Sequence, residues 1–179
     1  MLDPVCTDPR IRPITPADVD RTVELVHALA RYEQLEDQCH LTAGQLHEAL
    51  FGERRALYGL AATAGTEPGA PQVGYALFFL NFSTFEGVHG IYLEDLYVEP
   101  DQRGTGLGKA MLATLAATAV ANGFARVEWW VLNWNTPSIE FYRSWGAVSM
   151  DEWTVFRLTG PALTRTAAGT SGSTGSPRD

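Results

Sequence analysis

The most informative part of the chain is the stretch YLEDLYVEPDQRGTGLGK, which covers residues 92–109. It predicts an apolar strand, a short turn and a glycine-rich loop that opens a helix. Such a loop exposes backbone N–H groups at the positive end of a helix dipole, an arrangement that binds a pyrophosphate. A Walker loop is excluded because Arg103 stands where its first glycine would be and Ala110 where its hydroxyl would be. A dinucleotide fingerprint is excluded because it needs glycine in place of Lys109.

The size and composition of the chain suit one globular domain. Of the 179 residues, 45% are hydrophobic and 19% are charged, which is typical of a protein with a packed core. We expect a single domain over residues 1–160. From Thr164 onward the chain is rich in Thr, Ala, Gly, Ser and Pro and has no apolar period. Residues 161–179 are therefore predicted to be a low-complexity, loosely ordered tail without a role in catalysis.

The net charge narrows the classes of partner. At −8 it argues against a nucleic-acid partner, because binding to phosphate backbones relies on an excess of Lys and Arg. It is compatible with a cationic substrate. It is equally compatible with an acidic surface that only keeps the protein soluble, so charge alone does not decide between the two.

Compartment and metal content are read from what the sequence lacks. No apolar run is long enough to span a bilayer, and the N-terminus has neither a basic region nor an apolar core. Cys6 and Cys39 lie far apart and are predicted to be free thiols in a reducing cytoplasm. The four histidines show no metal-ligand spacing. We therefore expect a cytoplasmic protein with no membrane partner and no metal.

Strands and helices alternate along the chain. Strands are predicted over residues 11–14, 56–63, 73–82, 91–98, 127–132 and 153–158. Helices are predicted from a cap at Thr15 through Tyr32, after a cap at Thr42, over residues 106–121 and over residues 137–145. A polar loop over residues 83–90 carries Phe85 at its tip. This order predicts an α/β fold with a mixed sheet.

The glycine loop and three further blocks resemble the GNAT superfamily of N-acetyltransferases. The blocks are ARYEQLEDQ (residues 30–38), YLEDLYV (92–98), Arg103-x-x-Gly106-x-Gly108, and WNTPSIEFY (134–142). Their order and spacing are similar to the spermidine/spermine (diamine) N-acetyltransferase branch and its bacterial thialysine-acetyltransferase-like relatives. The resemblance implies a GNAT (acyl-CoA N-acyltransferase) fold, with a central mixed, mostly antiparallel sheet flanked by helices. It also implies acetyl-CoA as cosubstrate and a homodimer.

Acetyl transfer to an amine needs a proton acceptor and a proton donor. Glu94 is the expected acceptor, directly or through water, because the matching position in the family is a carboxylate that faces the substrate. The alternative for Glu94 is a surface residue on an edge strand, and Asp95 is expected to serve structure. Tyr142 is the expected general acid, since its phenol holds a proton at neutral pH and its family counterpart points at the CoA sulfur. Core packing, the alternative for this pair, fits Phe141 better.

The resemblance also assigns the residues that hold acetyl-CoA. The carbonyl oxygen and pantetheine arm would contact the backbone of Leu96, Tyr97 and Val98. The pyrophosphate would lie on Arg103, Gly104, Thr105, Gly106, Leu107, Gly108 and Lys109. The start of the next helix, Asn135, Thr136, Pro137 and Ser138, is assigned to the cofactor arm, with helix capping an equal alternative for Asn135 and Ser138.

A further group matches substrate-side positions of the branch. Its members are Tyr32, Glu33, Glu94, Glu128, Trp129, Trp130 and Glu152. A cationic amine between carboxylates and indole rings is physically reasonable. Glu36 and Asp37 continue the acidic helix end after Glu33, but a solvated surface explains them better than substrate contact.

The predicted function is transfer of the acetyl group of acetyl-CoA to a primary amine of a small cationic substrate by direct transfer. A diamine, a polyamine or a lysine-like amine would qualify, although the bulk of Trp129 and Trp130 counts against long polyamines. Two alternatives remain open. One is an acetyltransferase acting on a protein lysine or N-terminal amine, and the other is a CoA-binding module without turnover.

Overall fold

The computed structural model describes residues 2–169 of the chain. The chain forms two compact units, which divide between Trp130 and Val131. The first unit contains the whole sheet, and the second contains two short helices.

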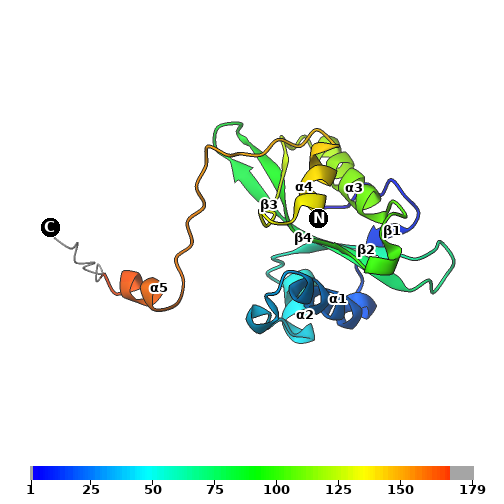
Figure 1. The fold of residues 1–179 in the computed structure, drawn as a ribbon, viewed down its shortest axis with the longest axis horizontal. Helices are drawn as coiled ribbons and strands as arrows, with labels where there is room; N and C mark the ends of the chain where they lie inside the picture. The colour runs from blue at the N-terminus through cyan, green and yellow to red at the C-terminus, as the bar shows by residue number, and fades with distance from the viewer. Residues whose placement is uncertain (1, 170–179) are drawn as a thin grey trace. The chain divides into compact units, whose positions relative to one another are not determined.

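The first unit is built on a five-stranded sheet in the order β1-β2-β3-β4-β5 (Figure 1). The strands are β1 (Ile11–Pro13), β2 (Tyr58–Thr63), β3 (Gln72–Ser83), β4 (Val88–Val98) and β5 (Val127–Glu128). The first four pair antiparallel, and β5 runs parallel to β4. The predicted mixed, mostly antiparallel sheet is therefore confirmed.

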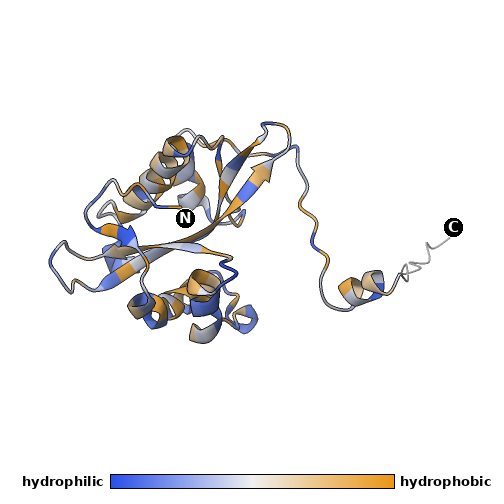
Figure 2. Ribbon diagram, turned by 180° about the vertical axis from the view of Figure 1, so that it is seen from behind, coloured by the Kyte–Doolittle hydropathy of each residue, from blue (hydrophilic) through white to orange (hydrophobic). Residues whose placement is uncertain are grey.

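Three helices cover the two faces of this sheet (Figure 1). A 3₁₀ turn (Pro16–Asp18) leads into α1 (Val19–Tyr32), and α2 (Ala43–Phe51) lies on the same face, whereas α3 (Leu107–Ala121) covers the opposite face. The predicted caps form: Thr42 Oγ1 accepts from the backbone N–H of Gln45, and Asp18 accepts from the N–H and hydroxyl of Thr15. Both α1 and α2 carry hydrophobic and hydrophilic residues, as surface helices do (Figure 2).

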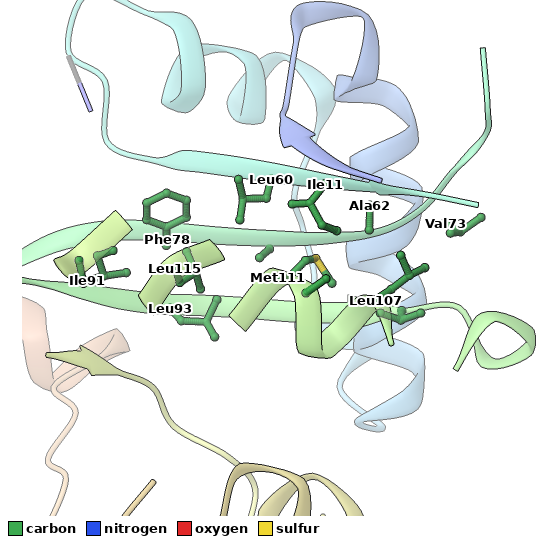
Figure 3. Packing of buried hydrophobic residues seen from close by; sticks show 14 of the residues in the cluster. Ile11, Leu60, Ala62, Val73, Phe78, Ile91, Leu93, Leu107, Met111 and Leu115 are labelled. Carbon is green, nitrogen blue, oxygen red and sulfur yellow. The ribbon is translucent and has the colours of Figure 1, made fainter. Parts of the chain in front are cut away.

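The sheet separates two hydrophobic clusters. Leu107, Met111 and Leu115 of α3 pack against strand residues such as Phe78 and Leu93 (Figure 3). The second cluster joins α1 and α2 to the other face of the sheet. Its best-buried members are Leu25, Leu46, Leu50, Ala61 and Tyr75. Each face of the sheet is thus a packed interior, and a polar side chain that points into either one loses contact with water.

A β-bulge interrupts β4 at Glu94. Leu93 pairs with Phe78 and Asp95 pairs with Leu77, so the two neighbouring residues of β3 face three residues of β4, and Glu94 has no partner in the ladder. The bulge reverses which side chains face which helix. Before it, the odd-numbered Leu93 packs in the α3 cluster, whereas after it the odd-numbered Tyr97 packs in the α1 cluster. Asp95 is consequently turned towards α1.

Burial makes Asp95 expensive to ionise. Desolvation, together with the negative charges of Glu94 and Glu33, raises the pKa of its carboxyl from 3.8 to about 6. The hydroxyl of Tyr75 donates a long hydrogen bond of 3.4 Å to Asp95 Oδ2, which lowers that pKa only in part. Because ionisation costs free energy only in the folded protein, the free energy of unfolding falls as the pH rises from about 4 to above 6.

The second unit holds α4 (Thr136–Arg143) and α5 (Gly160–Ala167). The predicted strand over residues 153–158 is wrong, because this segment pairs with no strand within residues 2–169. Trp153 and Phe156 are 68% and 91% exposed. An apolar run of β-forming residues becomes a strand only where a ladder partner exists. The start of the predicted tail is helical in α5, and residues 170–179 lie outside the described part of the chain.

Two other predicted boundaries need correction. The strand expected over residues 127–132 pairs with β4 only at Ile91 and Tyr92, which is consistent with a bulge that kinks β4 two residues later. The loop expected over residues 83–90 is shorter, because Val88, His89 and Gly90 continue the ladder with β3. Phe85 lies in the remaining turn and is 95% exposed.

We predict that Asp95→Asn raises the thermal unfolding midpoint by about 5 °C at about pH 7.5, because it removes a cost on the order of 2 kcal/mol. The gain should shrink towards about pH 4, where Asp95 of the wild type is protonated. Thermal melts across this pH range measure it. The exposed Asp37→Asn serves as the matched control and should show no such trend. An equal gain for Asp95→Asn at both ends of the range would contradict the assignment.

Candidate functional site

The glycine loop has the backbone shape that anion binding requires. Gly104 and Gly106 have φ angles of +78° and +89°, in the left-handed region that a side chain disfavours. Gly106 is the N-cap of α3, and no side chain caps that helix end. An α-helix leaves its first N–H groups without partners inside the helix, so the start of α3 presents donors and a positive dipole end. The loop can therefore hold a pyrophosphate.

Arg103 connects this loop to two predicted site residues. Its Nε donates to the carbonyl oxygen of Val98 at 3.1 Å. Its guanidinium carbon lies 4.8 Å from the ring centre of Tyr32 and 5.8 Å from that of Tyr97. In the structure Arg103 is therefore stacked on aromatic rings, between the predicted cofactor loop and the predicted substrate side.

The edge of β4 opens next to the loop. Leu96, Tyr97 and Val98 pair with β3 on one side, and on the other side β5 reaches no further along β4 than Tyr92. Within residues 2–169, this stretch of the edge has no second strand partner. An unpaired strand edge offers main-chain donors and acceptors to a ligand. The backbone of Leu96, Tyr97 and Val98 is therefore placed where the predicted contacts with the carbonyl oxygen and the pantetheine arm could form.

Three carboxylates gather at the bulge: Glu33, Glu94 and Asp95, which we call the acidic cluster. The charges of Glu33 and Glu94 both raise the pKa of Asp95, and burial raises the pKa of Glu33. Glu33 caps the C-terminus of α1, and Glu94 is the exposed bulge residue. None of the three forms an ion pair within residues 2–169. Negative charges held together in this way favour a bound cation.

Asp95 and Tyr75 belong to the candidate site by their position, although the sequence did not place them there. Asp95 was expected to serve structure, and Tyr75 was not singled out. Strict alternation along β4 places Asp95 on the same face as Leu93, and only the bulge turns it towards Glu33. The pKa of the fully buried Tyr75 is raised by burial and then by the charges of Asp95 and Glu33. A half-buried carboxyl with a strongly perturbed pKa beside other acids is typical of a functional site.

The predicted substrate residues near β5 differ in how accessible they are to a ligand. Asn81 Nδ2 donates to Glu128 Oε2 at 2.7 Å, and Arg126 Nε lies 2.8 Å from the same oxygen, so the charge of Glu128 is already compensated. Trp129 packs against the α3 cluster. Trp130 is 59% exposed and meets the ring of Tyr92 edge-on at 5.9 Å. Of these three, only Trp130 offers an open aromatic surface.

The remaining predicted residues lie in the second unit. Asn135 Oδ1 accepts from the N–H of Ser138 at 3.4 Å, so Asn135 caps α4 and the capping alternative holds for it. Thr136 and Pro137 form the first turn of that helix. Tyr142 is half-buried beside Phe141, and Glu152 is exposed. Their roles beside Glu94 and the glycine loop stay predictions.

Within residues 2–169, no three His, Cys, Asp or Glu side chains are grouped so that they could hold a metal ion. No helix in this range combines the length and the hydrophobicity needed to cross a membrane. Cys6 and Cys39 are free thiols, as predicted.

Comparison of the sequence with known proteins identifies the family of this chain. Residues 24–147 match the acetyltransferase (GNAT) family. A thialysine N-epsilon-acetyltransferase of Bos taurus is 35% identical over 86% of this chain and 94% of its own length. A human spermidine/spermine N(1)-acetyltransferase-like protein is 30% identical over 83% of this chain and 22% of its own length.

Among solved structures, an integron cassette protein from the mobile metagenome of V. cholerae has the same fold. It superposes with a TM-score of 0.72 at 24% identity, over 88% of this chain and 96% of its own. The family match covers the glycine loop, the bulge and the acidic cluster, and the bovine relative is similar over most of the chain. With this support the chain belongs to the acetyltransferase (GNAT) family and is an N-acetyltransferase.

Proposed function

We propose that this protein transfers the acetyl group of acetyl-CoA directly to a primary amine of a small cationic substrate, of the lysine-like or diamine class. The observation that carries the substrate class is the acidic cluster, three carboxylates at the bulge without an ion-pair partner within residues 2–169. The similarity to a thialysine N-epsilon-acetyltransferase supports the lysine-like choice.

The residues present fit acetyl-CoA. The uncapped start of α3 suits the pyrophosphate, and side chains added at Gly104 or Gly106 would be strained by the positive φ angles. The open edge of β4 at Leu96, Tyr97 and Val98 suits the pantetheine arm. Bound there, acetyl-CoA supplies the thioester carbon that the amine attacks.

The acidic cluster divides into two roles. An alkylamine is protonated at neutral pH, with a reference pKa near ~10.4, and must lose a proton before it attacks. Glu94 is exposed at the bulge, where it can take that proton directly or through water. Glu33 and Asp95 hold positive charge nearby, because each is destabilised as an anion until a cation neutralises it.

Tyr142 completes the reaction as general acid. Its phenol donates a proton to the departing CoA thiolate, so free CoA leaves as the thiol. The amine nitrogen has by then formed its bond to the acetyl carbon, and the carbon–sulfur bond has broken. The protonated amine gives up two protons on the way to the amide, the first to Glu94 before the attack and the second to solvent once the carbon–nitrogen bond has formed, while the thiol takes one proton from Tyr142. Solvent then returns one proton to Tyr142 and removes the one on Glu94, so each turnover releases one proton.

The second prediction concerns substrate charge. Glu33→Gln should raise KM for lysine-like amines and diamines by roughly tenfold, the scale of one lost interaction with a charged group. It should spare an amine acceptor that carries no second charge. Steady-state kinetics over a panel of such amines measures it. Glu36→Gln removes the same charge from an exposed position three residues later and should match the wild type. If Glu33→Gln also matches the wild type for cationic acceptors, a protein acceptor becomes the better explanation.

The third prediction concerns catalysis. Tyr142→Phe keeps the ring and removes only the acid, so kcat should fall by roughly 10²-fold with acetyl-CoA affinity unchanged. Thiol-release kinetics and calorimetric binding separate the two effects. Tyr58→Phe removes the same hydroxyl from β2 and should leave kcat unaltered. An unchanged kcat in Tyr142→Phe would remove this residue from the mechanism.

The fourth prediction concerns assembly, since we infer that the protein is a homodimer. Trp145, Trp153 and Phe156 are 41%, 68% and 91% exposed, a large apolar surface for one short segment. Sedimentation equilibrium at micromolar concentration should give twice the 19.6 kDa mass of one chain. The double substitution Trp153→Ser with Phe156→Ser should shift the mass towards the monomer. A wild type that sediments as a monomer would refute the dimer.

A further inference from the structure

A residue far from the glycine loop in sequence holds that loop in place. Arg10, which directly precedes β1, donates from Nη1 to the carbonyl oxygen of Thr105 at 3.2 Å. Its Nη2 lies 3.9 Å from the point where a Cβ would stand on Gly106. The guanidinium therefore lies against the centre of the loop, although nothing in the motif itself points to it.

Arg10 is fixed on its other side by Asp8. Nε of Arg10 donates to Asp8 Oδ1 at 3.0 Å and Nη2 donates to Oδ2 at 2.7 Å, so the two side chains meet through a planar fork. The backbone N–H of Arg10 also donates to Asp8 Oδ1. The hydrogen bond from Arg10 lowers the pKa of Asp8, which therefore stays ionised at neutral pH.

The backbone of Arg10 is anchored as well. Its carbonyl oxygen accepts from the N–H of Thr63 at 2.9 Å and from the hydroxyl of Thr63 at 3.1 Å. Thr63 ends β2, so Arg10 is joined to the central sheet. The guanidinium is consequently a fixed donor and not a mobile surface charge.

The contact to Thr105 determines where a neighbouring N–H points. In a trans peptide the C=O and the following N–H point in opposite directions, and no described peptide bond is cis. Holding the Thr105 carbonyl against Arg10 therefore aims the N–H of Gly106 away from Arg10. Gly104 and Gly106 both adopt positive φ. Because glycine meets little steric resistance to rotation, the Thr105–Gly106 peptide could turn over if this contact were absent.

We propose that Asp8 and Arg10 are a positioning pair that fixes the Thr105–Gly106 peptide, so that the glycine loop is preorganised for the pyrophosphate. Arg10 acts through the loop and does not itself touch the phosphates, because its fork is occupied by Asp8. The inference rests on the proposed function, in which this loop holds acetyl-CoA.

Calorimetric binding of acetyl-CoA to four proteins tests the pair: wild type, Arg10→Gln, Asp8→Asn and Arg54→Gln. Arg10→Gln should weaken binding by roughly tenfold, the scale of a hydrogen bond from a charged group. Asp8→Asn should weaken it too, although it leaves the positive charge of Arg10 in place. The exposed Arg54→Gln makes the same charge change elsewhere and should bind as the wild type does.

A second readout separates positioning from a general loss of structure. S-acetylpantetheine has no pyrophosphate, so its KM should be the same in all four proteins, as should kcat at saturating acetyl-CoA. Unchanged acetyl-CoA affinity in Arg10→Gln would overturn the proposal. Tighter or unchanged binding in Asp8→Asn beside weaker binding in Arg10→Gln would also overturn it, since Arg10 would then contact phosphate directly. A parallel rise in KM for S-acetylpantetheine would assign the pair to the fold alone. Failure of the wild type to bind acetyl-CoA would instead remove the proposed function.

Discussion

The bulge at Glu94 is the constraint on which the site in the first unit depends. One extra residue in β4 changes the side to which every later side chain points, so Leu93 faces α3 while Asp95 and Tyr97 face α1. It leaves Glu94 outside the ladder, and pairing with β5 ends two residues before it. A regular strand would turn Asp95 towards α3. The irregularity thus creates the acidic cluster, which lies next to the open edge of β4.

The acidic cluster lowers the stability of the fold, and the proposed function gives a reason for it. Asp95 is half-buried beside two other carboxylates, with one long hydrogen bond from Tyr75 as compensation. Other charges of the first unit are treated differently: Asp18 is held by Arg12 and Thr15, which bring its pKa to about 2 despite burial. The chain can therefore neutralise a buried carboxylate, and it does not do so at the bulge. A cationic substrate would supply the missing charge.

The glycine loop is supported from two sides. Arg103 stacks over Tyr32 and Tyr97, which ties the loop to the end of α1, and Arg10 holds the Thr105 carbonyl from the start of β1. Glycines give the loop the backbone freedom to surround an anion, but the same freedom leaves it undefined without external contacts. Two arginines supply those contacts. One of them, Arg103, stacks on Tyr32, which is a predicted substrate-side residue.

The sequence by itself determined the element order, the helix caps and the glycine loop, because these depend on local chemistry. Thr42 caps α2 and Gly106 opens α3 for reasons visible within a few residues. It also determined the family, since four blocks in fixed order are specific together. Glu33 and Glu94 were predicted to be substrate-side residues, and in the structure the charges of both raise the pKa of Asp95. Apolar patterning failed at residues 153–158, where a run of strand-forming residues found no partner within residues 2–169.

Only tertiary structure decided the facing of Asp95, the compensation of Glu128 by Arg126 and the reach of Arg10 to Thr105. Each depends on strand register or on contacts between residues distant in the chain, and neither is written in the local periodicity of the sequence.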